Sequence, residues 1–562
     1  MMTELPPGLL LILGALPVAL LRGWARNAVA LAIPVVSAAH LFSLPEGIPL
    51  TYSFFGLEAT PVRIDRLSLV FGYIFHIAAA LGVIYAFHLR KNLELASALI
   101  YAGAAIGAVF AGDLLTLFVY WELTAISSVF LILARGTRAA MRSSVRYLVI
   151  QVGSGVILLA GIVLWVNDTG SLAFEHMDLG SPATVLILIA FGIKCAFPLL
   201  HNWLPDSYPE ATATGTVFLS AFTTKLAIYA LARGYAGLDL LIWVGAVMAV
   251  FPMFYAAIEN DLRRVLAYCL NNQLGFMVVG IGIGTEMSLN GTAAQAFSHI
   301  LYKALLFMSM GAVLHRVGTV KASELGGLFR SMPWTTGFCL VGAASISTPL
   351  FSGFVSKSLI ITAAADEGHW LVWLVLLFAS VGVFCLAGIK VPYFAFFAQD
   401  SGKRCKEAPF NMLVAMGLVS ILCIGIGLWY QPLYAILPFD VAYDPYTPSH
   451  VVGQLQLLLF TALAFAVLIR TRLYPPEMRA TNLDSDWFYR RLLVSAVRGV
   501  AHWTSRFHSA ALDDLRLRTG QFIAQIFRVH GPHGILARTW PTGSMVLWAA
   551  VLLGGVLLIY FR

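Results

Sequence analysis

Ionisable side chains interrupt the long apolar runs of this sequence near the middle of those runs. They are Glu122, Lys194, Lys225 and Lys303, with His299 one helical turn before Lys303. A charge at the centre of a bilayer costs about 2.5 to 3.5 kcal/mol on insertion scales, so such residues are functional candidates. Burial lowers the pKa of an amine and a nearby carboxylate raises it, so moving the partner shifts a proton between neighbours. This set predicts a proton relay inside a membrane.

Two prolines lie beside lysines within apolar runs, Pro198 after Lys194 and Pro349 before Lys357. Proline has no N–H, and its ring clashes with the carbonyl four residues earlier, so Pro198 predicts a helix break at Lys194. Irregular backbone at this depth persists only inside protein or beside a wet cavity. Two such breaks in one chain are typical of transporters built from inverted repeats.

Each of these residues also has a structural alternative that the sequence leaves open. Lys357 is near the end of its run and can snorkel to the interface, whereas Lys225 and Lys303 cannot. Glu122 and Lys194 can form a buried pair that only ties two helices together. Lys390, just before Pro392, is an undecided member of the set.

The composition places these charges in a membrane protein. The chain has 562 residues, of which 59% are hydrophobic and 11% charged, whereas soluble domains have about 25% charged residues. The apolar runs predict about sixteen spanning helices, with boundary errors of a few residues. They are 8–21, 27–43, 66–89, 94–111, 113–134, 145–167, 182–201, 214–234, 238–258, 265–284, 292–314, 335–359, 370–398, 411–430, 452–470 and 543–561. We therefore expect an all-α polytopic membrane protein with about 14 to 16 spans; the runs lack the alternation of a β-barrel.

Loop charges predict the orientation of these spans. Basic residues follow the odd-numbered spans, as at Arg22/Arg26, Arg90/Lys91, Arg135/Arg138/Arg142 and Lys403/Arg404/Lys406, while acids follow even-numbered ones, as at Glu175 and Asp366. Lys and Arg collect on the cytoplasmic side, so both termini are expected outside. The first run follows an acid rather than a basic segment, which favours a span over a cleavable signal.

Residues 484–531 break the pattern of spans. Apolar residues recur there at helical spacing between arginines, which predicts an amphipathic helix lying along the membrane or the protein. A soluble cap packed on itself is the alternative. The segments "YPPEMRATNL" before it and "HGPHG" after it are expected to be its hinges.

Other chemistry finds no support in the sequence. The net charge of +8 resides in short loops, which does not indicate nucleic acid binding, and the six cysteines form no CxxC or Cys/His cluster. "GIGIG" at 280–284 lacks the strand–helix context of a nucleotide site. We expect no catalytic residue, metal or cofactor. His40 and His76 are isolated and are expected to be structural, and Asp113 is expected to cap a helix.

Several segments resemble a known family, the proton-translocating antiporter-like subunits of Mrp-type sodium/proton antiporters, respiratory complex I and membrane-bound hydrogenases. They are "DLLTLFVYWELT" (113–124), "GIKCAFPLLHNWLPDSYPEA" (192–211), "TKLAIYALAR" (224–233), "IENDLRRVLAY" (258–268), "SHILYKALLFMSMGAVLHRVG" (298–318), "LGGLFRSMPWTT" (325–336) and "PLFSGFVSKSLI" (349–360). Among family members the chain looks most like the D-type component of the Mrp antiporters. The segment "LAYCLNNQLGF" departs from the serine-rich family pattern.

The resemblance implies two inverted five-helix repeats, at 94–234 and 238–398, after N-terminal spans at 1–93 and before C-terminal spans at 411–470. A lateral helix at 484–531 and a last span at 543–561 follow. Glu122 and Lys194 become the ion pair of the first half-channel and Lys225 the connecting lysine. His299 and Lys303 become the central relay, Lys357 the terminal residue, and His201 an accessory near the first break.

The function implied is proton conduction within a larger membrane complex that exchanges Na⁺ or K⁺ for H⁺, in the plasma membrane of a prokaryote. The alternative is a proton-pumping subunit of a redox complex whose electron transfer lies on partner subunits. A structural subunit with an inactive relay is a third hypothesis. The sequence does not distinguish the first two, nor the cation or the direction of transport.

Overall fold

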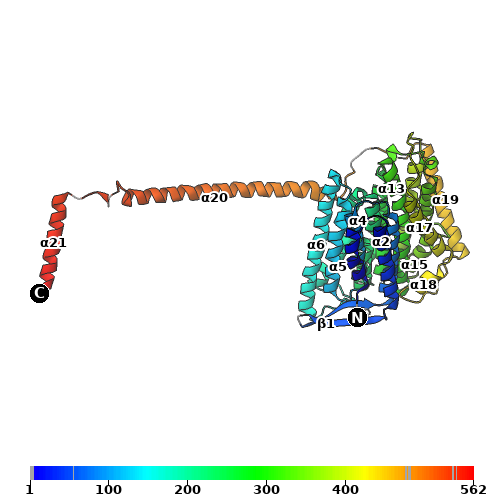
Figure 1. The fold of residues 1–562 in the computed structure, drawn as a ribbon, viewed down its shortest axis with the longest axis horizontal. Coiled ribbons are helices and arrows are strands. Elements are labelled where there is room, and N and C mark those ends of the chain that lie inside the picture. Colours follow the sequence, from blue (N-terminus) through cyan, green and yellow to red (C-terminus); the bar gives the residue numbers. More distant parts are fainter. Residues whose placement is uncertain (1–4, 55, 475–476, 479–481, 535–536, 540) are drawn as a thin grey trace. The chain divides into compact units, whose positions relative to one another are not determined.

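The computed structural model describes residues 5–54, 56–474, 477–478, 482–534, 537–539 and 541–562. The chain divides into two units, one ending at Asn482 and one beginning at Leu483. Each unit is described by itself below. Figure 1 shows the helices of the first unit standing side by side as a bundle.

Helices account for every predicted span. Among the described residues, 13 helical stretches are long and apolar enough to cross a membrane: α2 (Gly23–Ser43), α3 (Arg66–Tyr85), α4 (Asn92–Val109), α5 (Leu114–Leu133), α6 (Arg138–Thr169), α9 and α10 together (Ala213–Gly234), α11 (Asp239–Ile258), α12 (Leu262–Ile283), α13 (Glu286–Val317), α16 with its extension (Trp370–Phe397), α17 (Phe410–Leu428), α19 (Pro448–Arg470) and α21 (Thr542–Tyr560). Two shorter apolar helices are α1 (Pro7–Leu20) and α7 (Pro182–Cys195). The span predicted at 335–359 is divided into α14 (Pro333–Ala344) and α15 (Ser352–Asp366). Short helices α8 (Trp203–Ser207) and α18 (Gln431–Ala435) complete the bundle.

A β-hairpin adds two strands to the predicted helices. Strands β1 (Gly47–Phe54) and β2 (Leu57–Ile64) pair antiparallel after α2, in a segment expected to be a loop. Thr60 donates its N–H to the Asp113 carboxylate (2.8 Å), and Arg63 donates its N–H to the Phe110 carbonyl (2.7 Å). The hairpin is therefore held by the turn between α4 and α5. Such a contact between distant parts of the chain cannot be predicted from the pattern of residues in the hairpin itself. Asp113 also caps α5 by accepting from the Thr116 N–H, as expected.

The helices that carry Lys225, His299 and Lys303 are among the most buried ones. In the most apolar window of each, 94% of the residues of α12 and α13 and 100% of those in Ala213–Gly234 are buried, against 17% in α19. A charged side chain is tolerated in a membrane mainly where other helices surround it. The bundle thus places its polar residues where protein, not lipid, supplies their partners.

Both proline-broken helices are present. α7 ends at Cys195, one residue beyond Lys194, and Ala196 (φ 62°) and Leu199 (φ 69°) are left-handed. α14 ends at Ala344, and Leu350 (φ 74°) is left-handed before α15 begins. The residue directly after the proline, a leucine in both segments, has the same unusual backbone conformation. The two breaks therefore share this local backbone geometry.

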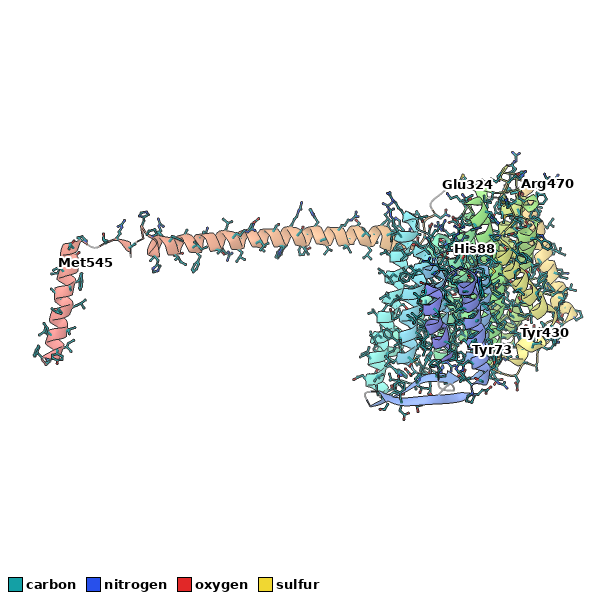
Figure 2. All side chains as sticks on the ribbon, in the orientation of Figure 1. Tyr73, His88, Glu324, Tyr430, Arg470 and Met545 are labelled. Atoms are coloured by element: carbon teal, nitrogen blue, oxygen red, sulfur yellow. The ribbon has the colours of Figure 1, made fainter. Side chains whose placement is uncertain are left out.

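The second unit contains the predicted amphipathic helix. A π-helical turn (Phe488–Leu492) leads into α20 (Leu493–His530), and α21 follows. Every residue of α20 is exposed within its own unit, and its side chains extend freely in Figure 2. A cap packed on itself is therefore wrong, because α20 buries none of its residues. Residues 475–476 and 479–481 of the first predicted hinge lie outside the described residues.

Candidate functional site

Lys194 ends α7 with its side chain fully buried against α5. Its Nζ donates to the Trp121 carbonyl (2.5 Å) and to Thr124 Oγ1 (2.8 Å), and it lies 4.2 Å from the centroid of the Trp121 ring. These contacts give an ammonium group two oxygen acceptors and an aromatic face. Neither Trp121 nor Thr124 was a sequence candidate, although both flank Glu122 in "YWELT".

Glu122 does not form the direct ion pair with Lys194 that the resemblance implies. No nitrogen–oxygen pair between these two described side chains lies within 4.0 Å, and Glu122 Oε1 is buried without a hydrogen-bond partner among the described residues. The carboxylate lies against Gly155 of α6, where any Cβ would collide with Oε1. The two charges still interact through space. The reason for the open pair is local: Lys194 reaches nearer oxygens on α5, while Glu122 points toward α6.

Lys225 lies in the first turn of α10 (Thr223–Gly234), just after the interruption that follows α9 (Ala213–Ala221). Its Nζ donates to the Ser220 carbonyl at 2.6 Å. A helix end leaves carbonyls without N–H partners, so this interruption supplies an acceptor for the amine.

His299 lies at the centre of the charged set. The ring is fully buried in α13, packs edge-on against Tyr302 (5.3 Å between centroids), and has no hydrogen-bond partner on either nitrogen among the described residues. Lys303 follows His299 by one helical turn on α13 and is also buried. An imidazole without partners accepts or donates a proton at either nitrogen. The structure therefore buries an imidazole without partners one helical turn from Lys303.

Lys357 points inward from α15 rather than snorkelling. Its side chain is buried, and Nζ donates to Ser347 Oγ (2.9 Å) inside the break between α14 and α15. A small cavity beside it is also lined by Ser380, His450 and Gln454. Gln454 donates to the Ser347 carbonyl (3.1 Å), which holds the broken backbone in place. The snorkelling alternative is wrong for this residue.

A buried network of amides and hydroxyls spans the second half and was missed from sequence. Gln273 Oε1 accepts from Gln295 Nε2 (3.0 Å) and from Tyr302 OH (2.9 Å), and Ser356 Oγ donates to Gln295 Oε1 (2.6 Å). Tyr302 and Ser356 are the sequence neighbours of Lys303 and Lys357. The sequence signal for this network is "NNQ" in the middle of a predicted span, because amide side chains buried there need hydrogen-bond partners.

Lys390 lies outside the charged set. Its Nζ donates to the carbonyls of Ala256 (3.2 Å), Ala257 (2.8 Å) and Glu259 (2.9 Å) at the end of α11, and it pairs with Glu477 (2.8 Å). These contacts cap a helix and hold the segment that follows α19. Its part in a relay is not supported by this geometry.

His201 is buried just beyond the first break. Its ring packs edge-on against Phe251 of α11, with 4.6 Å between the centroids. The contact joins the break after α7 to a helix of the second predicted repeat. An accessory role for His201 stays a prediction.

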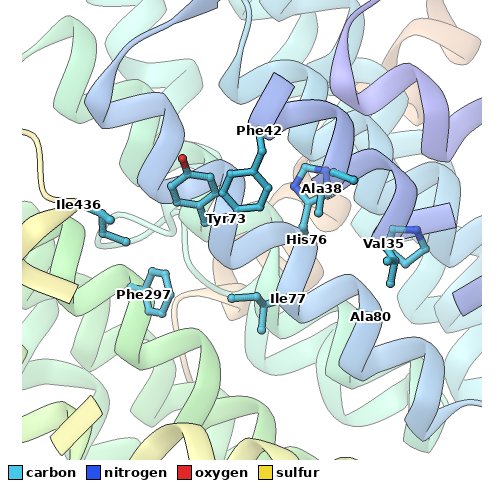
Figure 3. A pocket seen from close by; sticks show the side chains of 11 residues that line it. Val35, Ala38, Phe42, Tyr73, His76, Ile77, Ala80, Phe297 and Ile436 are labelled. Carbon is cyan, nitrogen blue, oxygen red and sulfur yellow. The ribbon is translucent and has the colours of Figure 1, made fainter. Parts of the chain in front are cut away.

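A larger cavity of about 720 Å³ is apolar and separate from the charges (Figure 3). Phe42, Tyr73, Phe297 and His76 contribute to its wall. Both nitrogens of His76 are engaged, with Ser37 Oγ (2.9 Å) and the Gly72 carbonyl (2.7 Å). His76 is thus structural, as expected from sequence. Among the described residues no group of His, Cys, Asp or Glu could hold a metal ion.

Comparison with known proteins identifies the family. Residues 111–382 match the transmembrane family described as NADH:quinone oxidoreductase/Mrp antiporter. The D-type Na⁺/H⁺ antiporter subunit of Alkalihalophilus pseudofirmus is 30% identical over 366 residues, covering 60% of this chain and 73% of the relative. The chain belongs to this family.

Other similar proteins belong to respiratory complexes. The N-type NADH-quinone oxidoreductase subunit of Desulforudis audaxviator is 31% identical over 353 residues, covering 58% of this chain and 70% of that protein. A chain of the membrane-bound sulfane sulfur reductase, an archaeal respiratory membrane complex, has the same fold. That match has a TM-score of 0.70 and 22% identity, and it covers 99% of this chain and 100% of the other. The protein is accordingly a polytopic membrane protein with an antiporter-like fold.

Proposed function

We propose that this chain is the proton-conducting membrane subunit of a multisubunit monovalent cation/proton antiporter. The observation that carries the proposal is a set of ionisable side chains buried inside the helix bundle. They are Lys194, Lys225, His299, Lys303 and Lys357, together with the buried Oε1 of Glu122. The 30% identity to the D-type Na⁺/H⁺ antiporter subunit supports the antiport assignment.

The acceptors of the lysines suggest how a proton moves. Lys194, Lys225 and Lys357 donate to carbonyl or hydroxyl oxygens and to no carboxylate in the described part of the chain. When such an amine loses its proton, no directly hydrogen-bonded carboxylate is left behind, so the penalty of breaking a direct ion pair does not arise. Protonation of one amine also disfavours protonation of the next, because like charges repel. A proton arriving at Lys225 would thus drive one off Lys303.

A redox-driven proton pump is the second candidate. The chain is 31% identical to the N-type NADH-quinone oxidoreductase subunit, which supports this candidate about as well as the antiporter relative supports the first. The relay is the same in both. Co-purified partners distinguish them: small antiporter subunits accompany the first, and iron–sulfur and quinone-binding subunits accompany the second.

The placement in the membrane forms part of the proposal. We place the protein in a prokaryotic plasma membrane with both termini outside and α20 on the cytoplasmic side, because the basic loops mark that side. The exposed apolar residues of α20 provide a surface for another membrane subunit. The equivalent breaks at Leu199 and Leu350 support repeats at 94–234 and 238–398. Na⁺ or K⁺ is the exchanged cation.

The test is proton movement in inverted vesicles of cells producing the complex, followed by dequenching of a pH-sensitive dye on addition of Na⁺ or K⁺. Glu122→Gln, Lys194→Ala and the double variant are each expected to lose nearly all cation-dependent dequenching while still assembling, with the double no worse than either single. Lys406→Ala, which removes an exposed loop lysine, is the matched control and keeps full activity. Near-normal antiport in both single variants would show that the pair is only a structural tie.

A further inference from the structure

A basic cavity of about 580 Å³ lies where the turn between α1 and α2 meets the segment between α3 and α4. Its lining includes Arg22, Arg26, Asn27, His88, Arg90 and Asn92. Figure 2 marks its place by the label of His88. None of the residues given to the proton relay lines it. The cavity is therefore a feature that the proposed function does not use.

Three arginines supply its charge. The Arg26 guanidinium is buried and fixed by Asn27 Oδ1 (2.8 Å), Asn92 Oδ1 (3.2 Å) and the Leu89 carbonyl (2.6 Å). Arg22 and Arg90 are exposed and have no hydrogen bond or ion pair with any described residue. No carboxylate lines the cavity among the residues described. The site thus presents concentrated positive charge with unused, directed N–H donors, which is the chemistry that recognises phosphate.

Two helix starts add to this charge. α2 begins at Gly23 and α4 at Asn92, and neither has a side-chain cap for its first N–H groups. The N-terminus of a helix favours anions because unpaired N–H groups and the helix dipole point outward there. Gly23 and Asn92, the first residues of these two helices, both line the cavity, so both helix starts lie at it.

The residues flanking the cavity point to a lipid as the source of the phosphate. Leu20 (83% exposed), Trp24 (83%) and Leu93 (64%) lie at the same helix ends and cover no part of the protein. Tryptophan collects at the membrane–water interface, and basic pockets between transmembrane helices on the basic side bind anionic head groups. A free phosphate ion has no apolar part that could contact these side chains, whereas the acyl chains of a phospholipid could pack against them.

We propose that this cavity binds the phosphate head group of an anionic membrane phospholipid, with its acyl chains against Leu20, Trp24 and Leu93. Arg22 and Arg90 contact the phosphate, and Arg26 sets the floor of the site. The proposal is independent of the proton relay.

The experiment measures lipid association with the purified protein in nanodiscs, using photoactivatable phosphatidylglycerol and, for comparison, photoactivatable phosphatidylcholine. Wild type is expected to take up the anionic lipid preferentially. Each charge near a membrane surface is worth about fivefold in affinity (about 1 kcal/mol), so Arg22→Gln/Arg90→Gln should lose about 25-fold of the preference. Arg138→Gln/Arg142→Gln removes two exposed basic residues that follow an odd-numbered span and line no part of the cavity, and it should keep the preference.

Two outcomes overturn the proposal. One is an undiminished preference in Arg22→Gln/Arg90→Gln at normal thermal stability. The other is complete displacement of the lipid by inorganic phosphate, which would assign the cavity to a free anion. Should the double variant fold poorly, Trp24→Ser in the wild-type arginine background serves instead, with weaker capture expected and unchanged capture contradicting the acyl-chain contact.

Discussion

At the scale of single residues, buried lysines in this protein fall into two kinds. Lys194, Lys225 and Lys357 donate to oxygens released by helix interruptions or presented by a neighbouring helix. Lys390 instead pairs with a carboxylate, Glu477, and caps three carbonyls. An amine facing neutral acceptors gives up its proton without leaving a bare anion, whereas one paired with a buried carboxylate does not. We therefore propose that the type of acceptor distinguishes a lysine that carries protons from one that holds helices together.

The role of Lys390 is testable by stability. Lys390→Met leaves Glu477 buried without a partner, so we expect unfolding in detergent to be easier by about 3 to 5 kcal/mol. Glu477→Gln keeps a polar neighbour and should cost less. Cation-dependent proton movement per folded protein should stay near wild type in both variants. Stable protein with abolished proton movement would place Lys390 in the relay instead.

At the scale of elements, the two broken helices use a costly backbone conformation at equivalent places. Leu199 and Leu350 are left-handed, each directly after its proline. For a residue other than glycine this conformation costs on the order of 1 to 2 kcal/mol, so surrounding contacts must enforce it. Trp203 donates to the Ile193 carbonyl (2.8 Å) at the first break, and Gln454 donates to the Ser347 carbonyl at the second. The breaks are held by tertiary hydrogen bonds and not by proline alone.

Substitutions at these leucines separate backbone conformation from side-chain packing. Valine is branched at Cβ and resists the left-handed region, so Leu199→Val and Leu350→Val should each lose on the order of 1 to 2 kcal/mol of stability. Glycine adopts that region freely, so the corresponding glycine variants should stay within about 1 kcal/mol of wild type. Leu200→Val is the control without a positive φ. Thermal unfolding in detergent measures the stability of each variant. Glycine variants that are less stable than the valine variants would show that the backbone conformation is not what limits stability at these positions.

At the scale of the whole molecule, the loops are sorted by charge, and this sorting sets the orientation we propose. Basic residues recur after odd-numbered spans, and each predicted span corresponds to one described helix or, at 214–234 and 335–359, to two consecutive helices. A missed or added span would reverse the alternation beyond it. The orientation of the chain is thus tied to the helix count.

Impermeant thiol labelling tests that orientation. Cys405 is native to a basic loop and partly exposed, while the other described cysteines are buried except Cys385, which is replaced by serine. In inverted vesicles Cys405 and an introduced Ser509→Cys in α20 should react, and Glu175→Cys should react only in right-side-out spheroplasts. Reaction of Cys405 and Glu175→Cys from the same face would rule out the orientation, and a shielded Ser509→Cys would rule out the position of α20.

The apolar runs by themselves determined the helices, both breaks and the identity of the buried charges. This follows because a bilayer demands helices of fixed length and excludes unpartnered polar groups, constraints that act within one segment. The amphipathic helix at 484–531 was likewise legible from periodicity alone.

Only the tertiary structure decided which oxygen each amine meets. Glu122 and Lys194 were expected as a direct pair, yet Gly155 leaves room for the carboxylate on α6 and Trp121 offers a carbonyl to the amine. Lys390 was undecided because Glu477 is distant in sequence. The hairpin at Gly47–Ile64 was missed because it is held by the turn at Phe110–Asp113. In each case the deciding partner comes from another helix or turn, and spacing along one segment carries no information about it.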